Sequence, residues 1–214
     1  MKKCIIVSFE GTDGCGKTTQ SEKFFKYLKR KGIDAVLLRE PGGTKAGEEI
    51  RKILLNKNIN ISKWTELFLY LASRAQLISE VIKKYAEEEK VIILDRYFDS
   101  TITYQGYGRR LPINMIMEIQ KKFIKNFKPD ITFLIDEDIE KLWKNFKRKD
   151  RIEQESIEFQ KRVREGYLKL AKKEKRIKVI KRSSIEETFK SICKEWERFL
   201  NEKGRDKKFL KKCL

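Results

Sequence analysis

Apolar and polar residues alternate on two length scales along this chain. Short apolar runs rich in Ile, Val and Leu have the length of buried strands, and the longer segments that follow them repeat apolar residues with the period of an amphipathic helix. This alternation predicts an α/β domain built on a mainly parallel sheet. The five expected strands are Cys4–Phe9, Ala35–Arg39, Val91–Leu94, Ile131–Ile135 and Ile177–Ile180.

Helices are expected between these strands and after the last one. Ser184 is a good N-cap for the last helix because Glu187 follows three residues later. No repeat or low-complexity linker divides the 214 residues, which suit one hydrophobic core, so we expect a single domain over residues 1–201. Residues 202–214 combine Gly204 with a Lys-rich run and are expected to form a basic C-terminal tail. The expected helices begin near Lys17, Lys45, Lys63, Ile113, Ile139, Glu155 and Ser184.

The chain is strongly basic, with 51 Lys and Arg residues against 32 Asp and Glu residues and a formal charge of +19. A nucleic-acid-binding surface would gather such charge in one stripe. Here the charges are dispersed and interleaved with acidic residues, for example over residues 85–90, so a solvated surface is the preferred interpretation and no nucleic-acid partner is expected. No apolar run approaches the roughly 18 residues that a membrane span needs, so no membrane partner is expected either.

Cysteine and histidine content limits the chemistry. The chain has four cysteines without a C-x-x-C pair and no histidine, which favours reduced thiols in the cytoplasm over a zinc site. Without histidine the usual acid–base group near pH 7 is missing. The reaction is therefore expected to depend on electrostatics, metal ions or carboxylates.

The pattern G-x-x-x-x-G-K-[ST] occurs at residues 11–18, between an expected strand and an expected helix, as a phosphate-binding loop requires. In such a loop the backbone N–H groups surround a phosphate at the helix N-terminus, Lys17 reaches the β- and γ-phosphates, and Thr18 holds Mg²⁺. The residues expected to contact ATP are Gly11, Thr12, Asp13, Gly14, Cys15, Gly16, Lys17, Thr18 and Thr19.

The thiol of Cys15 lies two residues before Lys17, so a helix N-terminus and an ammonium group are both expected to activate it. The alternative is that cysteine is present only because a small residue fits the loop.

A phosphate-binding loop leaves GTPases, motor ATPases, nucleic-acid enzymes and small-molecule kinases open. Neither an N-K-x-D nor a D-x-x-G motif follows, which disfavours a regulatory GTPase.

Two further motifs follow expected strands. Arg39-Glu40-Pro41-Gly42-Gly43-Thr44 comes after the second strand, and Asp95-Arg96-Tyr97 comes after the third, with Tyr104-Gln105-Gly106 shortly behind it. Together with the phosphate-binding loop, this set resembles the thymidylate kinases.

The resemblance implies a three-layer P-loop fold of the nucleoside-monophosphate-kinase type, with a five-stranded parallel sheet, helices on both faces and a short lid. It also implies a cytoplasmic homodimer that uses Mg²⁺ and transfers the γ-phosphoryl group of ATP to dTMP.

Asp95 ends a parallel strand beside the phosphate-binding loop, where a carboxylate can hold a Mg²⁺-bound water. Arg96, next to it, is placed to bridge the phosphates of donor and acceptor. Through the resemblance, Arg39 binds the acceptor phosphate. A strand end with solvated charges is the alternative for all three residues.

Tyr70 and Arg74 are four residues apart on an expected helix and therefore share a face. Through the resemblance, Tyr70 stacks on thymine, where the family usually has phenylalanine, and Arg74 bonds a carbonyl of the base. An aromatic residue packed in the core of an amphipathic helix gives the same pattern.

The resemblance assigns four more polar residues to the acceptor. Thr101 and Gln105 correspond to positions at the polar edge of thymine, and Tyr104 to the residue that crowds the 2′ position of the sugar. Asp13 corresponds to an acidic residue that addresses the 3′-hydroxyl or the metal shell.

A cluster of charged residues at about 145–156 is expected to form the lid. The resemblance is to the bacterial type in which the variable positions of the phosphate-binding loop carry no basic residue and a lid arginine stabilises the transferred group. Arg151 is the first candidate for that arginine and Arg148 the second. A charged loop between helices is the alternative.

Two other functions stay open at this point. A deoxynucleoside kinase would phosphorylate a hydroxyl group and need a carboxylate base. A nucleic-acid-stimulated ATPase would accord with the positive charge, although the dispersion of that charge disfavours it.

Overall fold

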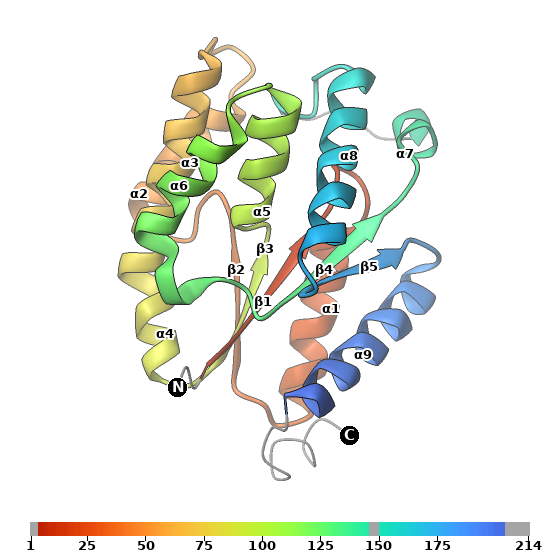
Figure 1. The fold of residues 1–214 in the computed structure, drawn as a ribbon. Helices are drawn as coiled ribbons and strands as arrows, with labels where there is room; N and C mark the ends of the chain where they lie inside the picture. Colours follow the sequence, from red (N-terminus) through yellow and green to blue (C-terminus); the bar gives the residue numbers. More distant parts are fainter. Residues whose placement is uncertain (1–3, 146–149, 204–214) are drawn as a thin grey trace.

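A computed structural model of the chain, which describes residues 4–145 and 150–203, has one parallel sheet at its centre (Figure 1). Its five strands run in the order β2-β3-β1-β4-β5, and every pairing is parallel. The predicted three-layer α/β architecture is therefore confirmed. The strands are β1 (Ile5–Glu10), β2 (Ala35–Arg39), β3 (Val91–Asp95), β4 (Ile131–Asp136) and β5 (Ile177–Lys181).

Helices fill the connections, as the apolar periodicity predicts. Three of the longer ones, α3, α8 and α9, have a serine N-cap whose side chain accepts a backbone N–H bond, and Ser184 is one of these caps. The helices are α1 (Lys17–Arg30), α2 (Lys45–Leu55), α3 (Lys63–Leu77), α4 (Lys83–Glu87), α5 (Phe98–Thr101), α6 (Ile113–Ile124), α7 (Ile139–Asn145), α8 (Ile157–Lys173) and α9 (Ile185–Glu202).

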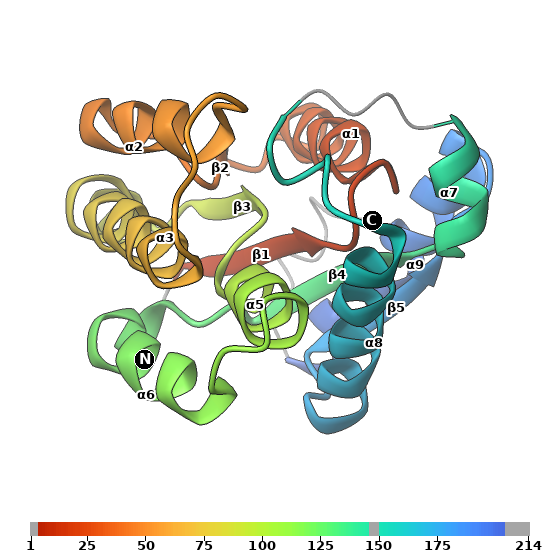
Figure 2. The same ribbon diagram turned by 90° about the horizontal axis from the view of Figure 1, so that it is seen from above.

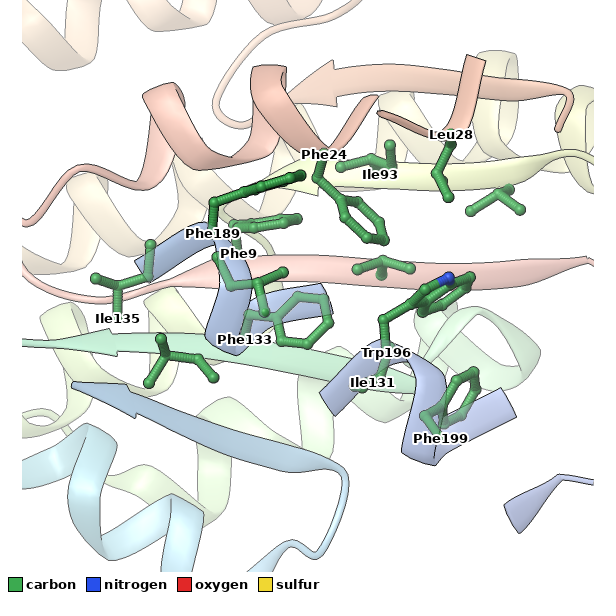
Figure 3. Close-up of a cluster of buried hydrophobic side chains, with 14 of the residues drawn as sticks. Phe9, Phe24, Leu28, Ile93, Ile131, Phe133, Ile135, Phe189, Trp196 and Phe199 are labelled. Atoms are coloured by element: carbon green, nitrogen blue, oxygen red, sulfur yellow. The ribbon is translucent and has the colours of Figure 1, made fainter. Parts of the chain in front are cut away.

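One face of the sheet is covered by α1 and α9. The alternate residues Val7 and Phe9 of β1 point to this face and pack with Phe24 of α1 and Trp196 of α9, all four fully buried (Figure 3). The rings of Phe24 and Trp196 meet edge to face at 5.3 Å between centroids. This aromatic core fixes α1, and hence the loop before it, against the sheet.

The opposite face is covered by α3, α4, α6 and α8, together with the helical segment that starts with α5 (Figure 2). The intervening β1 residue, Ile6, packs on this side with Leu77 and Leu94. The segment from Phe98 to Gly108 is a short α-helix that continues as a π-helix over Ile102–Gly108. No helix was expected here from the sequence.

The carboxyl ends of the strands meet at one edge of the sheet (Figure 1). Phe9 of β1 is in register with Asp95 of β3, and Arg39 of β2 is in register with the same aspartate. The phosphate-binding loop, the Asp95-Arg96 pair and the turn after Arg39 are therefore neighbours in space. In doubly wound sheets this edge is where ligands bind.

Two of the segments expected from the sequence fall partly or wholly outside the described residues. The basic tail at 202–214 is described only up to residue 203, where α9 ends. The lid segment is described at 145 and at 150–156, and Arg148 lies outside. Across the described part of the chain, no helix has the combined length and apolar character needed to cross a membrane.

Candidate active site

A cleft of about 630 Å³ opens at the carboxyl edge of the sheet. It runs from the phosphate-binding loop, past the ends of β2 and β3, to α3 and the segment at 150–153. The site residues predicted from the sequence that line this cleft are Asp13, Gly14, Gly16, Lys17, Thr18, Thr19, Arg39, Tyr70, Asp95, Arg96, Thr101, Tyr104 and Gln105. Residues that the sequence analysis singled out in separate motifs therefore line one common cleft.

The phosphate-binding loop leads directly into α1, which begins at Lys17. Gly16 has φ 97°, and Gly11 has φ 141° with no room for a Cβ against the carbonyl oxygen of Ile135, so both positions require glycine. Lys17 is buried, and its Nζ donates to the carbonyl of Thr12 at 2.7 Å. The loop therefore offers backbone N–H groups, a helix N-terminus and an ammonium group to an anion.

Cys15 lies beneath this loop. Its side chain is 1% exposed and belongs to the core under α1, with Sγ 3.8 Å from Lys17 Nζ. Burial favours the alternative in which cysteine fills a small space, because an alkylating reagent has no direct access to the thiol.

Thr18 and Asp95 come together across the base of the cleft. The hydroxyl of Thr18 donates to Asp95 Oδ2 at 2.6 Å. An oxygen pair of this kind suits Mg²⁺, which commonly takes one or two protein ligands and completes its shell with water and substrate phosphates. Within residues 4–145 and 150–203, no group of three or more His, Cys, Asp or Glu side chains could hold a metal ion by itself.

Arg96 reaches from the end of β3 over the phosphate-binding loop. Its backbone has φ 66°, and its Nη1 donates to the Gly11 carbonyl at 3.0 Å. Nη2 donates to Asp13 Oδ1 and, at 3.0 Å, to the hydroxyl of Tyr104, whose ring lies under the guanidinium at 4.9 Å. The Tyr104 hydroxyl in turn donates to Asp13 Oδ2 at 2.9 Å. Arg96, Asp13 and Tyr104 thus form one connected cluster facing the cleft.

The charge on Asp13 is stabilised in this cluster. Burial alone would raise the pKa of its carboxyl, but the positive charges of Arg96 and Lys17 outweigh burial and hold the pKa below its usual value. Asp13 therefore stays ionised, and Arg96 keeps a fixed orientation.

Glu10 supports this cluster from behind and was not predicted as a site residue. Its buried carboxylate accepts hydrogen bonds from the backbone N–H of Tyr97 at 2.8 Å, from Ser100 at 2.6 Å and from Tyr167 at 2.8 Å. Burial and the nearby Asp99 raise the pKa of Glu10 to about 7. Its position directly before Gly11 was the available signal, although a strand-end glutamate is usually solvated.

Two arginines outside the phosphate-binding loop, Arg39 and Arg51, also line the cleft. Arg39, half exposed, donates to Glu48 at 3.0 Å, and Arg51 donates to the carbonyl of Pro41 at 2.9 Å. Burial and the nearby Arg39 lower the pKa of Arg51. Two guanidinium groups of like charge repel one another, so this end of the cleft is suited to an anion that would neutralise both. Arg51 was missed because its helix shows no phosphate-binding motif.

Tyr70, Thr101 and Gln105 form the remaining wall, but Arg74 lies behind it. The Arg74 side chain is 1% exposed and does not belong to the described residues that line the cleft. Its hydrogen bonds and its ion pair with Glu40 engage every N–H group of the guanidinium. The acceptors are Glu40 at 2.7 Å, Thr101 Oγ1 at 2.8 Å, Gln120 at 2.6 Å and the Tyr97 carbonyl at 3.1 Å.

The described part of the lid contributes Asp150, Ile152 and Glu153 to the cleft. Arg151 is turned away from it: Nε donates to the carbonyl of Leu54 at 3.0 Å and Nη2 to Glu66 at 2.7 Å. The first candidate for the lid arginine is thus held outside the cleft in this conformation.

These features define a class of protein. A phosphate-binding loop, an Asp and Thr pair suited to Mg²⁺ and the pair Arg39 and Arg51 share one cleft, and Arg96 follows β3, the strand between β1 and β2. This is the arrangement of a P-loop kinase that phosphorylates a small anionic acceptor.

Comparison with known proteins narrows the class. The family model described as thymidylate kinase matches residues 9–192. A thymidylate kinase of Kosmotoga olearia is 44% identical over 197 residues, which span 90% of this chain and 95% of that protein. One from Thermoanaerobacter sp. (strain X514) is 48% identical over 169 residues, or 78% of this chain and 83% of that protein.

The fold agrees with the sequence comparison. The crystal structure of thymidylate kinase from Ehrlichia chaffeensis superposes with a TM-score of 0.76 at 34% identity, covering 90% of this chain and 98% of that one. The chain belongs to the thymidylate kinase family.

Proposed function

We propose that this chain transfers the γ-phosphoryl group of Mg·ATP to the 5′-phosphate of dTMP, giving dTDP and ADP for dTTP biosynthesis. The observation that carries the proposal is the shared cleft, which holds the phosphate-binding loop after β1, the pair Arg39 and Arg51 at the end of β2 and beyond it, and Arg96 after β3, the strand between β1 and β2. Family membership supports the choice of nucleotide.

ATP is assigned to the phosphate-binding loop. The backbone of residues 11–16 and the N-terminus of α1 bind the phosphates, and Lys17 exchanges its bond to the Thr12 carbonyl for phosphate oxygens. Thr18 and Asp95 would hold Mg²⁺, Asp95 through a water molecule. When bound, Mg²⁺ would supply positive charge to the phosphate oxygens.

The monophosphate is assigned to the opposite end of the cleft. Arg39 and Arg51 bind its phosphate, Tyr70 stacks on the base, and Thr101 and Gln105 meet the polar edge of the base. The Tyr104 ring borders the sugar, and Asp13 lies where a sugar hydroxyl or the metal shell can reach it. Arg74 acts on the base through Thr101, to which it is bonded.

The acceptor is already a phosphate oxyanion, so the reaction needs no general base and the absence of histidine is no obstacle. Catalysis then depends on alignment and on charge at the equatorial oxygens, supplied by Lys17, Arg96 and a lid arginine. Arg151 must leave Glu66 to serve as that arginine, and Arg148 is the other candidate. Lid closure would exclude water from the transferred group.

A panel of acceptors tests the proposal. With Mg·ATP present, we expect efficient ADP formation with dTMP, weaker activity with dUMP and dCMP, and none with thymidine. Preference for thymidine would establish a deoxynucleoside kinase. ATP hydrolysis stimulated by DNA or RNA, with a steep salt dependence, would establish the nucleic-acid enzyme.

We also propose that the protein works as a cytoplasmic homodimer. Exposed apolar side chains on α2 and α3 support this proposal, because a second copy of the chain would cover them. The rings of Trp64 and Phe68 on α3 stack with their centroids 6.4 Å apart, and Ile53 on α2 is also exposed. Sedimentation is expected to show a dimer, and Phe68→Glu is expected to shift it towards monomer. A monomeric parent protein would exclude the dimer.

A further inference from the structure

Glu66 of α3 is a buried carboxylate that joins three parts of the fold. Its side chain is 1% exposed. Oε1 accepts from Gln105 Nε2 at 2.8 Å and from Arg109 Nε at 3.0 Å, and Oε2 accepts from Arg109 Nη2 at 2.9 Å and from Arg151 Nη2 at 2.7 Å. Of these partners, Gln105 belongs to the wall of the cleft.

The charge state of Glu66 determines how the Gln105 amide is oriented. Burial would raise the pKa of Glu66, but the hydrogen bonds and charge of Arg109 hold it below its usual value, so the carboxylate is ionised. An ionised carboxylate only accepts hydrogen bonds. Rotating the amide by half a turn would place Gln105 Oε1 against Glu66 Oε1, so Nε2 is held on Glu66 and Oε1 is left as the polar atom available to the cleft.

Thr101, the second polar residue at this end of the cleft, has the opposite hydrogen-bonding role to Gln105, because it is held as a donor. Arg74 Nη1 donates to Thr101 Oγ1 at 2.8 Å, so the hydroxyl proton of Thr101 is free to be donated. The wall therefore offers one acceptor, at Gln105, and one donor, at Thr101. Each polarity is imposed by a buried charged residue behind the wall.

We propose that Glu66 is a positioning residue that selects the base: it fixes Gln105 as a hydrogen-bond acceptor, so the cleft takes a pyrimidine with a proton on N3 and rejects cytosine. This inference rests on the proposed function. Thymine and uracil carry N3–H beside a carbonyl oxygen, which match the acceptor and the donor of the wall. Cytosine has a lone pair on N3 and an amino group on C4, so both groups are mismatched.

The test compares kcat/KM for dTMP and dCMP in the parent protein and in Glu66→Gln. In the variant, the amide at position 66 can donate to Gln105, which frees Gln105 to turn its own N–H towards the base. The ratio of dTMP to dCMP activity is expected to fall at least tenfold, with KM for ATP unchanged. An unchanged ratio in a folded variant overturns the proposal.

Two further variants separate base selection from a structural effect. Arg109→Lys changes a partner of the same carboxylate but keeps a positive charge beside it and leaves the contact with Gln105 in place, so it should keep the parent ratio. The exchange variant Glu66→Gln/Gln105→Glu restores an acceptor to the cleft and should recover the preference for dTMP. A changed ratio in Arg109→Lys, or cytosine acceptance in the exchange variant, would count against Glu66 as the selecting residue.

The exchange variant also provides the test if Glu66→Gln does not fold, because it keeps one carboxylate in the pair formed by residues 66 and 105.

Failure of the inference is distinguishable from failure of the proposed function. If the parent protein does not phosphorylate dTMP, the proposed function is wrong. If the parent is active and the ratio ignores these substitutions, only the inference is wrong.

Discussion

Arg96 combines a strained backbone with a side chain that has several partners. Its φ of 66° is uncommon for a residue with a Cβ, and such strain is typical of functional sites. The backbone N–H bonds of Arg96 to Phe9 and of Tyr97 to Glu10 hold the turn, while the guanidinium spans the Gly11 carbonyl and Asp13. The Asp95-Arg96-Tyr97 motif predicted Arg96 as a site residue, but nothing in the motif indicates a positive φ at this position.

Replacing Arg96 by alanine is predicted to lower kcat by roughly 10²–10³-fold, because a donor aimed at the transferred group is lost. The fold should survive, since Asp13 keeps its bonds to Tyr104 and Gln160. Steady-state kinetics and a melting curve are the measurements. Near-normal turnover would remove Arg96 from the mechanism.

Tyr104 is predicted to exclude a 2′-hydroxyl from the sugar site by the bulk of its ring. Tyr104→Ala should narrow the preference for dTMP over the ribonucleotide, whereas Tyr104→Phe, which keeps the ring and loses the bond to Asp13, should retain it. The measurement is kcat/KM for both nucleotides with each variant. Equal discrimination by the parent and the alanine variant would show that the ring does not exclude the hydroxyl.

Glu10 gives the stability of the protein a predictable pH dependence. Because the pKa of Glu10 rises from 4.5 to about 7 on folding, the folded state binds more protons between these values. The contribution of Glu10 to the free energy of unfolding therefore falls as the pH rises from about 4.5 to about 7 and is constant above. Glu10→Gln stays neutral and should flatten this change.

Melting temperatures at pH 5 and pH 8 check this prediction. Between pH 5 and pH 8 the melting temperature of the parent protein should fall further than that of Glu10→Gln. The difference should be about 2–4 °C for each kcal/mol that Glu10 contributes to the free energy of unfolding. Parallel changes in both proteins would mean that Glu10 titrates normally.

Among the helices and strands, the helical segment 98–108 could not be predicted from the sequence. Thr101, Thr103, Gly106 and Gly108 are poor helix formers, so the segment was expected only as a set of motifs. Packing overrides that propensity: Gly108 leaves no room for a Cβ beside Phe159 of α8, and this close contact holds the π-helix in place. Thr101, Tyr104 and Gln105 come to one wall of the cleft because the segment is helical.

The lid is predicted to supply one catalytic arginine. If Arg151 moves from Glu66 into the cleft, Arg151→Ala should lower kcat by about 10²-fold with little change in KM for dTMP. Arg148→Ala is the matched comparison, and a large loss there alone would move the role to Arg148. Normal kcat in both variants would contradict catalysis by either arginine.

For the whole molecule, the sheet and its longer helices were predictable because the strands are short runs of mostly apolar residues and the longer helices carry an apolar stripe. The pattern of apolar and polar residues could not show which charged side chains would form ion pairs with one another. Glu66 and Arg151 are 85 residues apart, and Arg74 and Glu40 are 34 apart, so their pairing depends on how α3 lies against the sheet. The roles of Glu10, Arg51 and Glu66 follow from tertiary structure alone.

The most direct test of the central claim follows the label from [γ-³²P]ATP in the presence of Mg²⁺ and dTMP. We expect the label to appear in dTDP, no label to be released as phosphate at a comparable rate, and dTDP formation to stop when Mg²⁺ is chelated. Release of labelled phosphate without labelled dTDP would contradict the central claim.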